Sequence, residues 1–565
     1  MSLFSTIQQA SNALRVNELG LHVVGNNIAN ANTPGYIRQE LVQSPSVGVK
    51  YGELIMGTGV RAVGVVQKLD DFVVERLRQT ESSLASSEVQ ESLYRRMESV
   101  FGEMTDNDLS SQLAEFSSSV NDLLNQPGND ALRQLVLERG ATLTGNIRGI
   151  SRQLDELSLN LVSEVRSSAT EINRLTDQVA KLNRRIVEIE GGKTSGSDAV
   201  GMRDERLQVL QELAKVVDIR AVEQASGSVT VFVGGEYLVA DGIQRPVKYA
   251  LGKEGDENVP QVRLVDTDSP LQVHGGSLHG LYAARDGAIG KVQDGLDQFA
   301  RDMVETFNRI HSQGQGSEGF REVTSSNATD DRTAPLDLSG FPLTMQNGEF
   351  KIQVRDLQTG SVKTHAIRVK LQGGTDDSSL EDVQQAISAV SGLTATVTAE
   401  GRLRISADSS SLRFSFQEDT SGFLAATGIN TFFVGDSAST IAINDVVRDD
   451  PHLLATSLTG VGSGTENALR LAQAFDEPLE RLSGQSIKQA YENMVVQMTQ
   501  DINLQSGVSD GLRNFYKTLE GEHLSVSGVN LDEEAVKMIF YQRAFQASSR
   551  LIQASNEMLD VLVNL

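Results

Sequence analysis

Apolar residues recur near the C-terminus at the spacing of a packed helix. One series advances by alternating steps of four and three residues: Phe540, Ala544, Ala547, Leu551, Ala554, Met558, Val561 and Leu565. A neighbouring series has the same period: Phe545, Ser548, Ile552, Ser555, Leu559 and Leu562. This heptad-like spacing predicts a helix with two adjacent apolar seams, and two seams allow one helix to contact more than one partner.

The N-terminus has the same periodicity. Its stripe consists of Leu3, Ile7, Ala10, Leu14, Asn17, Leu21, Val24 and Ile28. We expect the two terminal helices to pair with each other and with other copies of the chain. Burying half of the seam positions would contribute on the order of ten kcal/mol, which ordering two free helices would largely offset. The ends are therefore expected to be ordered only in a polymer, and packing onto the body of the same chain is the alternative.

The helical pattern breaks at Asn32-Thr33-Pro34-Gly35-Tyr36, a turn signal in which proline fixes one φ and glycine supplies a positive φ. Asn26, Asn27 and Asn30 lie just before it, where their amides can satisfy the last carbonyls of the first helix. Short strands are expected after it. We predict that residues 1–64 and 520–565 together form a terminal segment.

The middle of the chain alternates between helical and strand-like periodicity. Residues 65–217, 280–312 and 451–519 are expected to form a helical body, with long helices over 131–189 and from 466 to about 504 and a further one after Gly511. Residues 218–279 predict a small β module with a hairpin of 229–233 and 236–240. Residues 313–450 predict an outer α+β module with a leading linker over 313–334.

These segments predict a mixed, multidomain fold. An α-helical terminal coiled coil and a helical-bundle body would carry the inserted β and α+β modules. Both ends of the chain must then return to the same place.

Composition excludes several functions. The net charge is −25 and the pI about 4.8, so a nucleic-acid partner is not expected. No apolar run approaches the roughly 20 residues that span a bilayer, and no cleaved signal peptide is visible. Cysteine is absent, which rules out disulfides and thiol chemistry.

Motifs that suggest catalysis lack their required context. Residues 507–511 match G-x-S-x-G, but that motif needs a preceding strand, and we expect only a break between helices. Gly192-Lys193-Thr194 has Val187 where a phosphate-binding loop needs glycine. His274 and His279 lie five residues apart without a third ligand nearby. We therefore expect no enzymatic activity, no cofactor and no metal.

Three segments resemble the signatures of the axial proteins of the bacterial flagellum. The first runs from Asn26 to Tyr36, and the others are 527–534 and 541–547. Within that family the hook-associated members are most similar, in length, in the long helical body and in residues 281–286, 308–311 and 428–433. The resemblance is weak across 216–275 and 313–425.

The resemblance implies a structural protein that forms a ring of like subunits at the junction between hook and filament. The terminal helices would form the inner tube, and the hook protein, the other hook–filament junction protein and a flagellar export chaperone would be partners. Type III export without a cleaved signal peptide would place the protein outside the cell, in the flagellum. The alternatives are the hook protein or another axial protein, and a secreted adhesin that binds through 313–450.

The residues expected at the assembly interface come from both termini. They are Leu14, Leu21, Asn26, Asn30, Pro34, Gly35, Asn530, Phe540, Leu551, Leu559 and Leu562. Among them Asn530 is a plausible N-cap, with Glu533 placed to complete a capping box.

Overall fold

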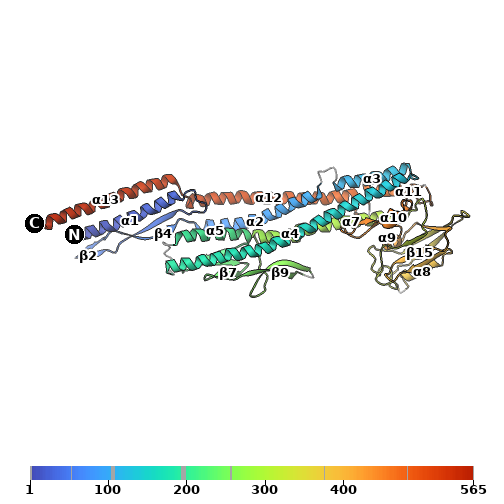
Figure 1. The fold of residues 1–565 in the computed structure, drawn as a ribbon, viewed down its shortest axis with the longest axis horizontal. Coiled ribbons are helices and arrows are strands. Elements are labelled where there is room, and N and C mark those ends of the chain that lie inside the picture. The colour runs from blue at the N-terminus through green and yellow to red at the C-terminus, as the bar shows by residue number, and fades with distance from the viewer. Residues whose placement is uncertain are drawn as a thin grey trace. The chain divides into compact units, whose positions relative to one another are not determined.

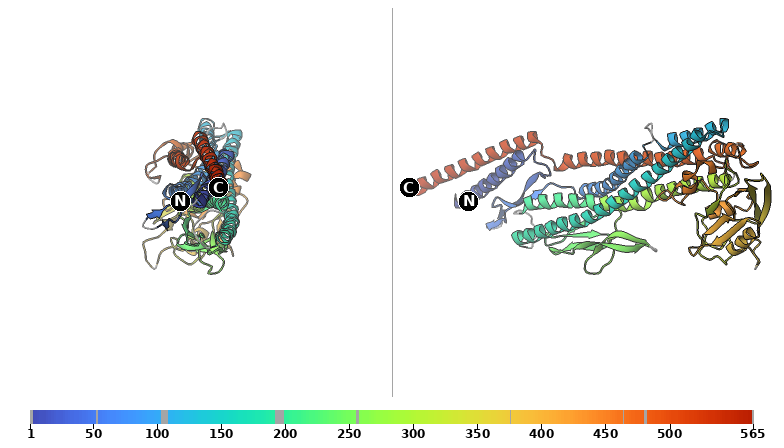
Figure 2. Two further views of the ribbon diagram at one scale, coloured as in Figure 1. Left: turned by 90° about the vertical axis from the view of Figure 1, so that its left-hand side faces the viewer. Right: turned by 45° about the vertical axis from the view of Figure 1, so that its right-hand side comes forward.

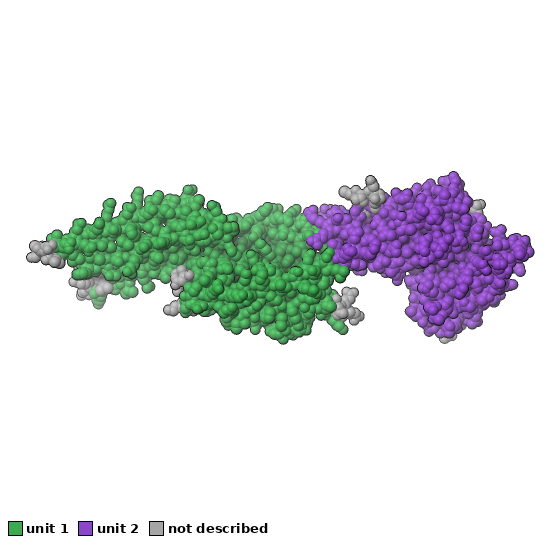
Figure 3. All heavy atoms as spheres, in the orientation of Figure 1, with its two compact units in different colours: residues 1–93, 159–285, 504–565 green, residues 94–158, 286–503 purple. Residues whose placement is uncertain are grey.

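The computed structural model describes residues 3–51, 54–102, 108–191, 199–254, 257–374, 376–462, 464–479 and 482–563. The fold is mixed and multidomain, with long helices and several small sheets. The chain forms two compact units (Figure 3). Unit 1 contains residues 1–93, 159–285 and 504–565, and unit 2 contains residues 94–158 and 286–503.

Unit 1 brings the two ends of the chain together. Its terminal elements are α1 (Leu3–Ala29), β1 (Gln39–Pro45), β2 (Val49–Tyr51), β3 (Leu54–Met56), β4 (Val60–Gln67) and α13 (Leu531–Val563). Helices α1 and α13 lie side by side in every view (Figures 1 and 2). Strand β1 pairs antiparallel with β4, and Val16, Val23 and Leu41 form a small core between α1 and these strands. The predicted pairing of the terminal helices with each other is therefore present within one chain.

The rest of unit 1 is a helical layer with a small sheet. Its elements, in whole or in part, are α2 (Asp71–Phe101), α4 (Asp130–Glu190), α5 (Val200–Val216), β5 (Arg220–Glu223), β6 (Val229–Val233), β7 (Glu236–Ala240), β8 (Ile243–Gln244), β9 (Val247–Glu254), β10 (Glu257–Leu264), α6 (Gly276–Ala283) and α12 (Ile487–Ser527). The β6–β7 hairpin is the predicted one, and Gly234 and Gly235 both have positive φ in its turn. Buried Asn183 of α4 donates to the Val229 carbonyl at 2.7 Å and accepts from its N–H at 3.0 Å. This amide fixes the sheet on the helix.

Helices in unit 2 surround a cluster of aromatic rings. The helices include α3 (Leu109–Asn125), the first part of α4, α7 (Gly290–His311) and α11 (Glu466–Asp476). The rings of Phe116 and Phe475 meet edge to face with centroids 5.4 Å apart, and Phe307, Phe432 and Phe433 complete the cluster. These residues come from four separate stretches of sequence, so the cluster holds the helices to the adjoining loop.

Two antiparallel three-stranded sheets form the other part of unit 2. The orders are β13-β12-β16 and β11-β15-β14. The elements are β11 (Glu322–Thr324), β12 (Gly348–Asp356), β13 (Val362–Val369), α8 (Leu380–Ser388), β14 (Leu393–Val397), β15 (Leu403–Ala407), β16 (Leu412–Gln417), α9 (Phe423–Thr427), β17 (Phe433–Val434), β18 (Ala442–Ile443) and α10 (Asp445–Asp449). Helix α8 starts at a capping box of Ser379 and Asp382, and its buried face joins the core of the sheets.

Several predicted boundaries differ from the structure. The helix expected from 466 to 504 ends at Asp476, because Pro478 cannot continue it, and α12 begins at Ile487. Conversely, α12 runs without a break through 507–511. Residues 280–312, expected to be helical, are interrupted by a π-helical turn at Ala284–Ile289.

Residues 313–334 were expected to be a linker, but they pack into unit 2. The backbone of Gln315 exchanges two hydrogen bonds with Ser457, and Phe320 does the same with Phe414. Phe320 and Val323 belong to the core of the sheets. The Gly, Ser and Asn residues that suggested flexibility instead permit tight turns inside a folded region.

Candidate assembly interface

Helices α1 and α13 are antiparallel and closely packed. Gly20 of α1 faces Tyr541 of α13, and a Cβ at Gly20 would lie 2.5 Å from Cε1 of that ring. Seven residues further along α1, Asn27 faces Glu534, seven residues earlier in α13. Glycine therefore permits the close approach, and a polar contact fixes the register.

Asn27 is fully buried, and its side chain uses all of its hydrogen-bonding capacity. Its amide nitrogen donates to the Gln39 carbonyl at 2.9 Å and to Oε2 of Glu534 at 3.0 Å. Its oxygen accepts from the Tyr36 hydroxyl at 2.8 Å and from the Gln39 N–H at 3.0 Å. One amide thus connects α1, the turn that follows it, strand β1 and α13.

Arg38 supplies the charge that balances buried Glu534. Its Nε donates to Oε1 of Glu534 at 2.9 Å, and its Nη2 pairs with Oε2 of Glu533 at 2.7 Å. Burial alone would lower the pKa of Arg38, but the hydrogen bonds that it donates to both glutamates raise that pKa above its usual value. The hydrogen bond from Arg38 in turn lowers the pKa of Glu533. The start of α13 is therefore clamped to the segment before β1 by a charged network.

The caps of the two helices follow the sequence prediction in part: Asn30 and Asn530 act as expected, whereas the amides of Asn26 and Asn27 donate to Gln39 and not to the last carbonyls of α1. Asn530 accepts from the N–H of Asp532 at 3.0 Å, as an N-cap does. The predicted capping box is not formed, because the Glu533 carboxylate points to Arg38 instead. At the end of α1, the Asn30 amide donates to the Asn26 carbonyl at 3.0 Å.

The turn after α1 has the predicted geometry. Gly35 has φ +74°, and the Tyr36 N–H donates to the Thr33 carbonyl at 3.2 Å. The Pro34 carbonyl accepts from Gln208 of α5 at 2.8 Å. Burial raises the pKa of Tyr36 to about 12, with Asp204 and Glu534 adding to the effect, so its hydroxyl stays protonated as a donor.

An exposed apolar stripe runs along the outward face of α13. It consists of Val536, Phe540, Leu551, Met558 and Val561, and Leu531 and Ile539 are exposed elsewhere on the helix. The second seam faces α1, with Ser555 buried and Ile552 and Leu559 half-buried. One seam of the predicted pair is thus used inside the chain, and the other remains available.

The predicted interface residues fall into two groups. Six are exposed: Phe540 and Leu551 of α13, the turn residues Pro34 and Gly35, and the polar Asn26 and Asn530. Leu14, Leu21, Asn30 and Leu559 are half-buried. Leu562 lies in α13, and its side chain is outside the described residues.

Sequence reasoning did not assign Asn27, Arg38 or Glu534 to the interface, although they form the most buried polar network at this site. Glu534 does not fall within either apolar seam, and Arg38 follows the turn in a stretch without hydrophobic periodicity. Neither position therefore stood out in the sequence. The adjacent pair Asn26-Asn27 offered the one available sign, since an amide within an otherwise apolar stripe often faces a buried partner.

Motifs for catalysis do not form sites. Residues 507–511 lie inside α12, and the Ser509 side chain is fully buried, so the strand-turn-helix context is not met. His279 hydrogen-bonds Ser86, and His274 is exposed beside Asp218. Residues 192–194 are outside the described residues. In the described part of the chain, no group of three His, Asp or Glu side chains could share a metal ion.

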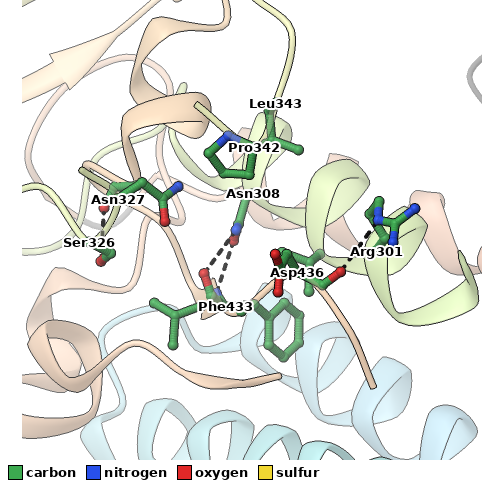
Figure 4. A pocket seen from close by; sticks show the side chains of 12 residues that line it. Arg301, Asn308, Ser326, Asn327, Pro342, Leu343, Phe433 and Asp436 are labelled. Carbon is green, nitrogen blue, oxygen red and sulfur yellow. Dashed lines mark hydrogen bonds between the residues drawn. The ribbon is translucent and has the colours of Figure 1, made fainter. Parts of the chain in front are cut away.

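A cavity of about 380 Å³ in unit 2 is lined by Arg301, Asn308, Asn327 and neighbours (Figure 4). The Asn308 amide donates to the Phe433 carbonyl and accepts from the N–H groups of Phe432 and Phe433. It therefore binds α7 to the segment at 432–433 and has a structural role. None of the helices in the described ranges combines the length and apolarity needed to cross a bilayer.

Three family models match the chain. The model of the flagellar hook-associated protein FlgK helical domain matches residues 94–327. The model of the flagellar basal body rod FlgEFG protein C-terminal region matches residues 520–565, and that of the flagella basal body rod protein matches residues 7–36. The last two include the helices that form the exposed apolar face and its partner.

Full-length relatives extend these matches. The chain is 24% identical to flagellar hook-associated protein 1 of Escherichia coli K12, over 99% of this chain and 100% of the relative. It is 24% identical to the protein of the same name from Bacillus subtilis 168, over 100% of this chain and 98% of the relative. A structure of the flagellar hook junction protein FlgK from Burkholderia pseudomallei aligns with a TM-score of 0.49 and 14% identity, covering 80% of this chain and 100% of the other.

Proposed function

This chain belongs to the flagellar hook-associated protein 1 family, and we propose that copies of it assemble through α1 and α13 into a ring. It is a structural protein of the bacterial flagellum at the junction between hook and filament. The single observation that supports assembly through α13 is its outward face. Five large apolar side chains there, from Val536 to Val561, are exposed although burying them would be favourable.

The structure of the pair suggests how assembly works. The Asn27–Glu534–Arg38 network and the Gly20–Tyr541 contact hold α13 in one orientation on α1. A face held in this way can meet a neighbour without first paying the full entropy of ordering the helix. We propose that like subunits, the hook protein and the other junction protein cover this face in the flagellum.

Before assembly α13 would favour aggregation, because seven large apolar residues of this one helix are exposed. We propose that a flagellar export chaperone covers α13 until export, and that the chain leaves through the type III channel without a cleaved signal peptide.

We also propose that the chain is divided into a terminal inner-tube segment (1–64 and 520–565), a helical body and modules 218–279 and 313–450.

The test adds charge to the exposed face. Leu551→Asp with Met558→Asp places two carboxylates on it, whereas Gln546→Asp with Gln553→Asp adds the same charge at exposed positions outside the seam. Both variants should keep the circular dichroism and melting curve of the wild type. We expect cells with the first variant to lose motility and to release flagellin into the medium, and cells with the second to swim.

Normal filaments with the Leu551/Met558 variant would contradict assembly through this face. Growth of the purified chain into long tubes would favour the hook-protein alternative, because a junction protein should stop at a short ring.

A further inference from the structure

A second cavity, of about 700 Å³, lies in unit 1 between α2, α5, β4 and β5. Its lining includes four arginines and three acidic residues: Arg78, Arg203, Arg206, Arg220, Asp71, Glu75 and Glu223. The site shares no residue with the α1–α13 pair. A surplus of guanidinium groups is unusual in a chain whose net charge is −25.

Two of these arginines each make three hydrogen bonds within the chain. Arg203 donates twice to Glu190, each at 2.9 Å, and once to Glu223 at 2.7 Å. Arg206 donates to Asn183 at 2.9 Å and to the Gly227 carbonyl at 2.7 Å. These two side chains therefore belong to the internal framework of unit 1.

Arg78 is different. It is only 8% exposed, and its Nη2 pairs with Glu75 at 3.0 Å. Its Nε and Nη1 are buried without any acceptor among the described residues. Burial lowers the pKa of Arg78, although Glu75 and Asp71 oppose the shift. Leaving such donors unmet costs free energy in the lone molecule, so their presence points to an acceptor that comes from outside.

The outer part of the cavity offers a second guanidinium. Arg220, in β5, is exposed, and within the described residues no acceptor is paired with it. Guanidinium groups suit carboxylate oxygens in geometry and charge. A second copy of the chain would present mainly carboxylates, because each copy carries 75 acidic and 50 basic side chains.

We propose that this cavity receives an Asp or Glu side chain of a second copy of the chain, with Arg78 as the buried anchor and Arg220 as the outer contact. The proposal rests on the proposed function, since it needs neighbouring copies in a ring. It adds a contact between subunits that is separate from the apolar face of α13.

The test separates a docking arginine from a structural one. Arg78→Met removes the buried guanidinium and keeps much of its apolar stem, while Glu75 can turn to solvent. For a docking role, the full-length chain should melt at the same temperature or about 2 °C or more higher. Cells that carry Arg78→Met should nevertheless lose filaments and release flagellin.

The matched control is Arg513→Met. Arg513 is a half-buried arginine of α12 in the same unit, paired with Asp510 and Glu88. That variant should change neither melting nor filament retention. A lower melting temperature for Arg78→Met would assign Arg78 a structural role and overturn the proposal. Normal filament retention by a stable Arg78→Met chain would overturn it as well.

A further experiment tests whether the cavity binds a free anion instead of a carboxylate of a neighbouring copy. The full-length chain and Arg78→Met are melted in sodium phosphate and in sodium chloride of equal ionic strength. If phosphate raises the melting temperature of the wild-type chain but not of Arg78→Met, the cavity binds a free oxyanion, and the proposal of a neighbour's carboxylate is overturned. Equal melting temperatures in both salts support the proposal that the cavity receives a carboxylate of a neighbouring copy. Filament retention in a strain that lacks the whole protein would instead refute the junction role itself.

Discussion

The carboxamide of Asn27 donates to Oε2 of Glu534 across 3.0 Å, and both side chains are fully buried. The bond joins the first and the last long helix of the chain. Apolar seams alone would tolerate a shift of one helix along the other, whereas a buried amide and carboxylate are satisfied in only one register. We infer that this pair sets which face of α13 turns outward.

Asn27→Asp should loosen the terminal helices. The variant places a carboxylate against Glu534 and removes a donor at nearly unchanged volume. A buried like-charge pair with a lost hydrogen bond should cost about 2–4 kcal/mol. Hydrogen–deuterium exchange at neutral pH should show faster exchange in α1 and α13, with unit 2 unchanged.

The control for that exchange experiment is Asn556→Asp. Asn556 is an exposed residue of α13, so the same chemical change meets only solvent. Equal exchange in the Asn27 variant and the control would show that the buried pair does not hold the helices.

Gly20→Ala should also destabilise the pair, through sterics. A Cβ there would come within 2.5 Å of the Tyr541 ring, which must move. We expect a loss of about 1–3 kcal/mol in urea unfolding. Gly25→Ala, in the same helix, meets nothing within 4 Å and should be neutral or stabilising by up to about 1 kcal/mol. Equal effects of the two substitutions would refute the close packing.

His311 should make unit 2 sensitive to acid. Its Nε2 accepts from the Ala455 N–H at 3.1 Å, so the proton of the neutral ring is on Nδ1, which donates to the Asn430 carbonyl at 2.9 Å. Burial lowers the pKa of His311 from 6.5 to about 4. The unfolded chain therefore takes up this proton first. Stability should be intact above about pH 6.5 and fall as the pH decreases toward about 4, by at most about 1.4 kcal/mol per unit.

The measurement is urea unfolding of the full chain at a series of pH values. His311→Gln should be less stable at pH 7 but should lose this part of the pH dependence. His274→Gln, at an exposed position, should keep it. A wild-type slope that persists in His311→Gln would assign the acid sensitivity to other groups.

Long elements with strong periodicity were predictable from the sequence. The helix expected over 131–189 became α4 (Asp130–Glu190), within one residue of the expected bounds at each end, and the hairpin of 229–233 with 236–240 is as predicted. Local signals sufficed there, because helix period and turn chemistry involve neighbours in sequence.

Non-local packing explains the errors. Residues 313–334 resemble a linker in composition, yet Phe320 and Val323 enter the core through contacts with strands about 80 or more residues away in sequence. Gly507 and Gly511 suggested a break, but α12 continues through both, because the cost of about 1 kcal/mol for each glycine is small beside the packing of a long helix.

The sequence by itself determined that both ends of the chain are amphipathic helices, that α13 has two apolar seams, and that a glycine turn follows α1. Each of these depends on residues close together in the chain. Only the tertiary structure decided which seam is covered, because that depends on Asn27 and Arg38 meeting Glu534 across 507 and 496 residues of sequence. Local periodicity specifies a face, whereas the partner of that face is set by buried polar groups that can be satisfied in one arrangement alone.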